Sequence, residues 1–248
     1  MTHKTGHEMT GLGPHNDAMN ISSSRNDNTD PRLILDRAIA TAGGVIAEVR
    51  PPQLTGATPC VGMDVRALLA HLIGVLGRIA ALGEGANPLA VNESAVADDR
   101  WLDAWLASAG RATDAWIDDA VLDRHMALPW IEGAGATVLA SYVSELTVHT
   151  WDLATATGQR PDWDDEVVEE AFAAMRGMLP VDNRLARYEK ISAARGFDEV
   201  TVPFAEAVPI SQDAPAIERL VAWTGRDPRR WRKSYSASSI SDQKRHPA

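Results

Sequence analysis

Glu145 and His149 are the residues of this sequence whose types and spacing most suggest chemistry, because they lie four positions apart within an apolar segment. At that spacing the carboxylate and the imidazole lie one above the other on the same face of a helix. Burying an ionised carboxylate without a partner is costly. Either the two residues satisfy each other as a buried Glu–His contact, or they share a cation.

His71 is a third candidate, on an apolar segment more than seventy residues earlier. It follows Leu68 by three positions and precedes Val75 by four, which places it on the apolar side of its expected helix. If the two helices face each other, two imidazoles and a carboxylate converge, a donor set that suits Zn²⁺ or a similar divalent ion. The spacing alone leaves the ordinary alternatives open, a satisfied core histidine and an exposed Glu–His pair.

Two neighbouring side chains add to this set. Asp152, one turn after His149, could orient a metal-bound imidazole from behind; the alternative is a place on the outside of the helix or a pair with an arginine. Cys60 is either a reactive thiol near the start of a helix or a small buried side chain.

Helices are expected to position these residues, because caps and apolar stripes with a 3.6-residue period recur along the chain. Asp30 followed by Pro31 begins the first helix, and Asp64 caps the helix that carries His71. The expected helices cover about 31–49, 64–83, 99–119, 136–157, 164–178 and 213–225. Short extended pieces are expected in 121–136 and in 200–210. The pattern predicts an all-α fold, an up-and-down four-helix bundle with a C-terminal extension of short strands and a helix.

Composition narrows the class of protein. The chain has 248 residues, 45% of them hydrophobic, so it is long enough to bury a substantial core. Its net charge of −10 argues against nucleic acid and anionic membranes as partners. A single cysteine excludes an internal disulfide and fits the cytoplasm, and neither an apolar run near 18 residues nor a signal peptide is expected.

The expected domain organisation is one helical, metal-binding domain between two tails. Residues 1–29 and 232–248 are polar, have no periodicity and are expected to be disordered, which leaves 30–231 as the domain. The basic stretch RDPRRWRK (226–233) is a local positive cluster, interpreted as a solvated tail rather than a binding site.

Three segments in this order resemble a known family: TPCVGMDVRALLAHLIG (58–74), ELTVHTWDLATATGQ (145–159) and DAPAIERLVAWTGRDP (213–228). They are similar to actinobacterial proteins of the DinB-like superfamily, in the metal-binding branch related to mycothiol-dependent maleylpyruvate isomerase. The resemblance covers about 30–231. One position departs from the pattern: Met63 stands where such proteins often have tryptophan, at the expected mouth of the pocket, so the substrate could differ.

The resemblance implies a DinB-like bundle with a divalent metal ion held by His71, Glu145 and His149. Zinc is expected, although nickel or another ion fits the same donors. The resemblance further implies a low-molecular-weight thiol, mycothiol, as cosubstrate, with S-transfer to a small electrophile or its isomerisation as the reaction. A metal-bound thiol or water, rather than a protein nucleophile, would then be the catalytic group. The alternatives are a metal-dependent hydrolase and a non-catalytic metal- or ligand-binding protein, as a monomer or a homodimer.

Overall fold

The computed structural model describes residues 30–93, 95–194, 202 and 204–231, so the two predicted tails lie outside the described residues. Helices dominate this part of the chain, and its one sheet has two short antiparallel strands, with Met126 opposite Gly133. The elements are α1 (Pro31–Ala47), η1 (Pro51–Gln53), α2 (Val65–Gly83), η2 (Pro88–Ala90), α3 (Trp101–Ala115), α4 (Ala120–Asp123), β1 (His125–Ala127), β2 (Glu132–Ala134), α5 (Gly135–Thr157), α6 (Asp165–Met178), α7 (Arg184–Ala194) and α8 (Ala216–Trp223). The predicted all-α class is confirmed, and so is the C-terminal extension.

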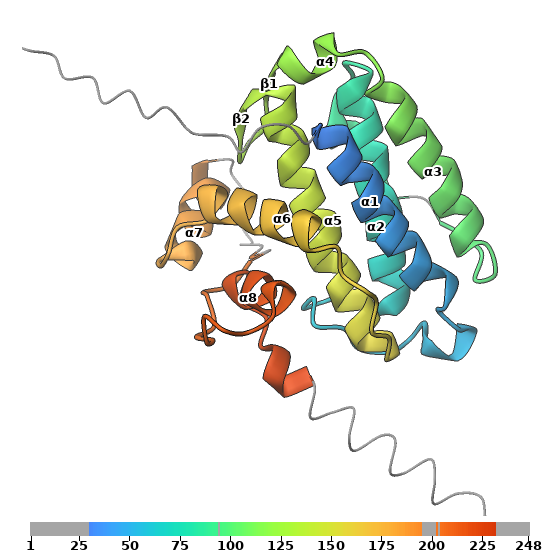
Figure 1. Ribbon diagram of the computed structural model, residues 1–248, viewed down its shortest axis with the longest axis vertical. Coiled ribbons are helices and arrows are strands. Elements are labelled where there is room, and N and C mark those ends of the chain that lie inside the picture. Colours follow the sequence, from blue (N-terminus) through green and yellow to red (C-terminus); the bar gives the residue numbers. More distant parts are fainter. Residues whose placement is uncertain (1–29, 94, 195–201, 203, 232–248) are drawn as a thin grey trace, which may run out of the picture.

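Four long helices, α1, α2, α3 and α5, form a bundle in which each helix packs against two others (Figure 1). Strict up-and-down order is broken at one point, because α2 and α3 run parallel. Arg66 at the start of α2 pairs with Asp98 just before α3, and Glu84 at the end of α2 pairs with Arg111 late in α3. The connection 84–100 must therefore return along the length of α2 before α3 can begin.

Helix α2 is the core helix that presents His71. The Asp64 carboxylate accepts a hydrogen bond from the Ala67 amide at 2.8 Å, which confirms the predicted cap. By length and composition α2 could cross a membrane, with a mean hydropathy of 1.7. However, 61% of that window is buried inside the bundle, against α3 and α5, and two arginines and a histidine interrupt its apolar sequence. A buried core helix accounts for this hydropathy.

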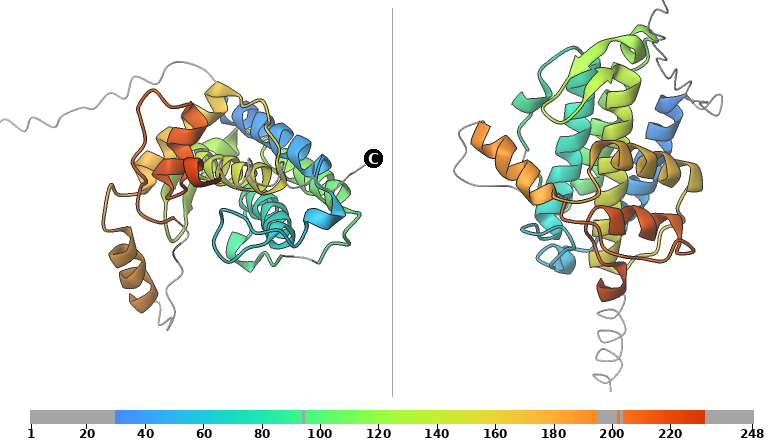
Figure 2. Two further views of the ribbon diagram at one scale, coloured as in Figure 1. Left: turned by 90° about the horizontal axis from the view of Figure 1, so that it is seen from below. Right: turned by 90° about the vertical axis from the view of Figure 1, so that its left-hand side faces the viewer.

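Helix α5 carries Glu145 and His149 and is buried on nearly every side. One side packs into the four-helix core, and the other meets α6 and α8 (Figure 2). The contact on that other side is a second apolar cluster that includes Val148 and Trp151. Gly158 ends the helix with φ +85°, a left-handed conformation that suits glycine. The C-terminal extension thus covers the face of α5 that the bundle leaves open.

Three local predictions were wrong. The third helix spans Trp101–Ala115 rather than 99–119, since Asp98 pairs with Arg66 instead of capping and the backbone breaks before α4. Helix α7 was not predicted, because its polar sequence lacks a clear apolar stripe. No strand forms at residue 202 or in 204–210; residues 200, 201 and 203 lie outside the described part of the chain.

Candidate metal centre

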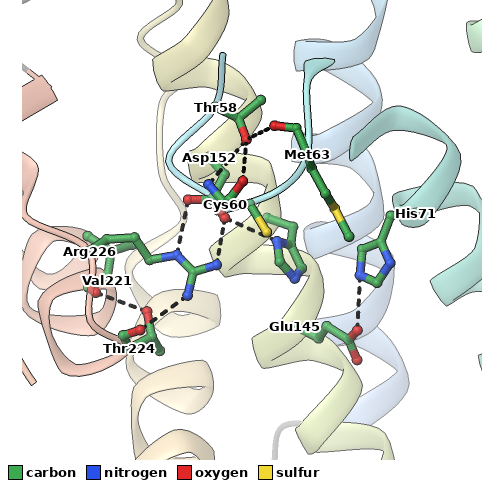
Figure 3. Close-up of polar contacts among 10 residues, drawn as sticks. Thr58, Cys60, Met63, His71, Glu145, Asp152, Val221, Thr224 and Arg226 are labelled. Atoms are coloured by element: carbon green, nitrogen blue, oxygen red, sulfur yellow. Dashed lines mark hydrogen bonds and ion pairs between the residues drawn. The ribbon is translucent and has the colours of Figure 1, made fainter. Parts of the chain in front are cut away.

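The structure brings His71, Glu145 and His149 together, because α2 and α5 are neighbours that run in opposite directions. One ligand atom from each side chain lies within 4.8 Å of the other two. The two imidazole rings stand edge to face, with centroids 4.8 Å apart and planes at 80°. Figure 3 shows His71 reaching from α2 towards Glu145 on α5. The convergence expected from the apolar face of each helix is therefore present.

Each histidine has one nitrogen engaged by a carboxylate outside this trio. His71 Nδ1 lies 3.1 Å from Oε1 of Glu93, and His149 Nδ1 lies 3.0 Å from Oδ2 of Asp152. His71 Nε2 lies 3.2 Å from Oε1 of Glu145, but not in hydrogen-bond geometry, so this buried atom has no hydrogen-bond partner among the described residues. A buried nitrogen without a partner, beside a carboxylate and a second imidazole, fits a metal ligand.

The charges in the trio depend on burial and on one another. Burial raises the pKa of Glu145, but the ion-pair contact with His71 and the charge of His149 together outweigh it and hold that pKa below its usual value. Burial, together with the charges of Arg226 and His71, lowers the pKa of His149 despite the contact with Asp152, so this imidazole is neutral at neutral pH. For His71, burial lowers the pKa, yet Glu145 and Glu93 together leave it raised. A carboxylate and a neutral imidazole are the protonation states that metal binding needs.

Asp152 is completely buried and accepts from two cationic or polar partners (Figure 3). Besides His149, it takes two hydrogen bonds from Arg226: Nε to Oδ1 at 3.1 Å and Nη2 to Oδ2 at 2.8 Å. Burial raises the pKa of Asp152, but the charge of Arg226 and the hydrogen bonds from His149 and Arg226 together outweigh it and keep that pKa lowered. The interpretation of 226–233 as solvated was wrong for Arg226, whose side chain is only 6% exposed.

The loop before α2, which contains Thr58, Cys60 and Met63, lies beside His149 and Asp152. The Thr58 hydroxyl contacts the Cys60 and Met63 backbone, which shapes the loop (Figure 3). Cys60 Sγ lies within 4.8 Å of ligand atoms of His149 and Asp152. Burial raises the pKa of Cys60, so it is a thiol rather than a thiolate at neutral pH. Asp152 already binds Arg226 and His149, so this second group offers no free carboxylate to a cation.

Sequence reasoning missed three residues of this region: Glu93, Arg226 and, as more than a core residue, Tyr142. Glu93 lies in an irregular segment without periodicity, which gave no signal. Arg226 directly follows Gly225, whose φ of +91° comes just after the end of α8, and a glycine at this position was the available signal in the sequence. Tyr142 precedes Glu145 by three residues and so shares its helix face.

The Tyr142 hydroxyl is buried and has no hydrogen-bond partner in the described part of the chain. A polar group in that state costs about 1–3 kcal/mol. We therefore expect Tyr142→Phe to raise the free energy of unfolding of the metal-free protein by about 1 kcal/mol, measured by urea denaturation. Tyr188→Phe is the control: the Tyr188 side chain is only partly buried, so the loss of its hydroxyl should bring no gain. A Tyr142→Phe protein less stable than wild type would contradict this account.

The comparisons with known proteins agree with the fold. Residues 35–154 match the family model described as the mycothiol maleylpyruvate isomerase N-terminal domain. This range contains His71, Glu145 and His149. Two proteins of Mycobacterium tuberculosis described as uncharacterized, from strains CDC 1551 and H37Rv, are each 29% identical over 200 residues. That alignment covers 79% of this chain and 98% of each relative. No solved structure gives a significant match.

The family match and the helical architecture coincide in the same part of the molecule. The matched residues begin in α1 and end near the C-terminus of α5, and so span the four-helix bundle. Over these residues, the chain is similar to the mycothiol maleylpyruvate isomerase N-terminal domain family, a DinB-like family.

Proposed function

We propose that this protein is a divalent-metal-dependent enzyme that uses a low-molecular-weight thiol, mycothiol, as nucleophile towards a small electrophilic substrate. The observation that carries the proposal is the meeting of His71, Glu145 and His149 within a domain similar to the mycothiol maleylpyruvate isomerase family. In this proposal the three side chains hold the ion, zinc by the nature of the donors. A bound zinc ion would lower the pKa of a coordinating thiol and so supply a thiolate at neutral pH.

The protein's own residues would prepare the site rather than attack the substrate. Asp152 and Glu93 lie at the Nδ1 atoms of the two histidines, which leaves Nε2 as the nitrogen free to face the ion. Glu145 adds one negative charge between the imidazoles, which limits the net charge of the centre. The reaction would be S-transfer, or isomerisation where the thiol adds to the substrate and leaves again.

A metal-dependent hydrolase is the second candidate, because the same donor set also occurs in zinc hydrolases. Two histidines and one glutamate also bind zinc in thermolysin and carboxypeptidase A, where the ion activates water. A thiol and water would compete for the same open coordination position. The identity of the nucleophile therefore has to be tested directly.

The test compares mycothiol with its S-methyl derivative, in which the sulfur can no longer ionise. With zinc-loaded protein we expect mycothiol to raise the thermal midpoint, by up to about 2.7 kcal/mol of stabilisation at 100 times its dissociation constant. The S-methyl derivative should give a much smaller shift. Maleylpyruvate is the first electrophile to assay, by its isomerisation and by thiol consumption. Equal shifts of the thermal midpoint with mycothiol and with its S-methyl derivative, and no thiol-dependent turnover, would exclude a thiol nucleophile and favour the hydrolase.

A further inference from the structure

The connection between α2 and α3 lies along α2 and is seated on two of its glycines. A Cβ at Gly77 would lie 3.0 Å from Cγ1 of Val91, and a Cβ at Gly74 would lie 3.1 Å from Cγ of Glu93. A methyl group at either position would already force the Val91 or Glu93 side chain to move by a few tenths of an ångström. Two glycines one turn apart thus allow the returning chain to approach α2 closely beside His71.

The far end of this connection is also attached to α2. Arg66 donates two hydrogen bonds to Asp98, with Nη2 and Oδ2 3.1 Å apart. Val91, Glu93 and Asp98 therefore meet α2 in the order that a chain returning antiparallel to the helix requires. The parallel arrangement of α2 and α3 is what brings Glu93 to His71.

Glu93 lies between an imidazole and a guanidinium. Its Oε1 is 3.1 Å from Nδ1 of His71 and 3.7 Å from Nη2 of Arg78. The same arrangement occurs at the other candidate ligand, where Asp152 lies between Nδ1 of His149 and the guanidinium of Arg226. The two candidate metal histidines thus have matching support, a carboxylate at Nδ1 backed by an arginine.

We propose that Glu93 is a positioning residue for His71: it accepts the Nδ1 proton and so directs the lone pair of Nε2 into the candidate metal centre. The inference rests on the proposed function, because it assigns Glu93 to the same centre. A neutral imidazole carries one proton, and a carboxylate at Nδ1 holds that proton there. Such supporting partners typically change metal affinity by about 10–100-fold.

An ordinary surface contact is the alternative, because the Glu93 side chain is 40% exposed. The chain offers a matched example of such a contact. His125 Nε2 and Glu132 Oε1 are 3.2 Å apart on the small sheet, with side chains 69% and 70% exposed. By contrast, the His71 side chain is only 13% exposed and leads into the core. If Glu93 were merely a surface partner, removing Glu93 or Glu132 would change zinc affinity by the same small amount.

The experiment compares Glu93→Ala and Glu93→Gln with Glu132→Ala. Zinc affinity is measured by competition with a chromophoric chelator, and unfolding midpoints are recorded for the metal-free proteins. We expect Glu93→Ala to weaken zinc binding about 10-fold. Glu93→Gln should lose less, because its amide oxygen still accepts the Nδ1 proton. Glu132→Ala should bind zinc as wild type does, and the metal-free midpoints of all variants should agree with wild type. Equal zinc affinity in wild type and Glu93→Ala would overturn the proposal.

A second measurement separates this proposal from the proposed function. Nitrogen-15 NMR of the histidine rings identifies the protonated nitrogen of His71 in the metal-free protein, at a pH where the ring is neutral. We expect the Nδ1–H tautomer in wild type and a partial shift to Nε2–H in Glu93→Ala. An Nε2–H tautomer in wild type would refute the role of Glu93 whether or not zinc binds. Failure of wild type to bind zinc, with the Nδ1–H tautomer present, would refute the metal site alone.

Discussion

Replacing His149 by alanine is expected to reduce zinc affinity by more than about 100-fold, because removal of a partner behind a ligand already costs about 10–100-fold. His149 is buried and neutral, with Nδ1 held by Asp152, so Nε2 is the nitrogen left for an ion. Elemental analysis of the purified proteins and chelator competition both measure the loss. Glu145→Gln should have a similar effect, since it removes the one anionic ligand.

The control for this prediction is His125→Ala. His125 lies on β1, is largely exposed and has a glutamate at a similar distance, so it matches His149 in residue type and differs in location. Its zinc content should equal that of wild type. Far-ultraviolet circular dichroism of His149→Ala should retain the helical spectrum, because Arg226 still neutralises Asp152. Equal zinc content in wild type and His149→Ala would disprove the proposed ligand set.

The helices could be predicted where a cap and an apolar stripe agree. Asp30 and Asp64 cap α1 and α2 as the sequence indicated, and Gly158 ends α5. These signals are local: a side chain within three residues satisfies the first free amides of the helix. The inward orientation of Glu145 and His149 followed from the same periodicity.

Contacts that join distant segments could not be predicted in this way. Nothing in the local sequence around Glu93 indicates that the chain returns along α2, because that path depends on α3 running parallel to α2. The pair between Asp152 and Arg226 joins positions 74 residues apart, and the basic residues after Arg226 made it resemble an exposed segment. Periodicity identifies which face is buried, whereas the partner on the other side is set by tertiary packing.

Arg226→Met is expected to lower the free energy of unfolding by about 3 kcal/mol at pH 7, because it leaves the buried Asp152 carboxylate without its cation. Arg226 is held in place by the end of α8: its amide donates to the Val221 carbonyl at 2.9 Å, and its Nη1 donates to the Thr224 carbonyl. Urea denaturation of the metal-free protein measures the loss. Arg229→Met is the matched control, since Arg229 pairs with Asp227 at an exposed position, where such pairs contribute about 0–1 kcal/mol.

A double-mutant cycle tests whether the loss comes from the pair. If the unpaired carboxylate causes the destabilisation, then adding Asp152→Asn to Arg226→Met should restore part of the stability. The interaction energy should fall within about 1–3 kcal/mol, as expected for residues in direct contact. Strict additivity of the two substitutions would show that Arg226 contributes by packing alone. The double variant should still lose zinc affinity, because the neutral amide that replaces the Asp152 carboxylate would no longer offer His149 a charged acceptor.

The pH dependence of the Arg226→Met effect has a definite sign. In wild type the pKa of Asp152 is held low by Arg226, so its contribution to stability is complete above its unfolded pKa, about 3.9, and is lost only as pH falls through the lower folded value. In Arg226→Met, which lacks the guanidinium, burial raises the folded pKa of Asp152 above the unfolded one. The stability of this variant then falls as pH rises from the unfolded pKa to the folded pKa. The difference between the two proteins should therefore grow as pH rises from about 4 towards 7. A difference that is constant over this range would show that the buried carboxylate is not the source of the loss.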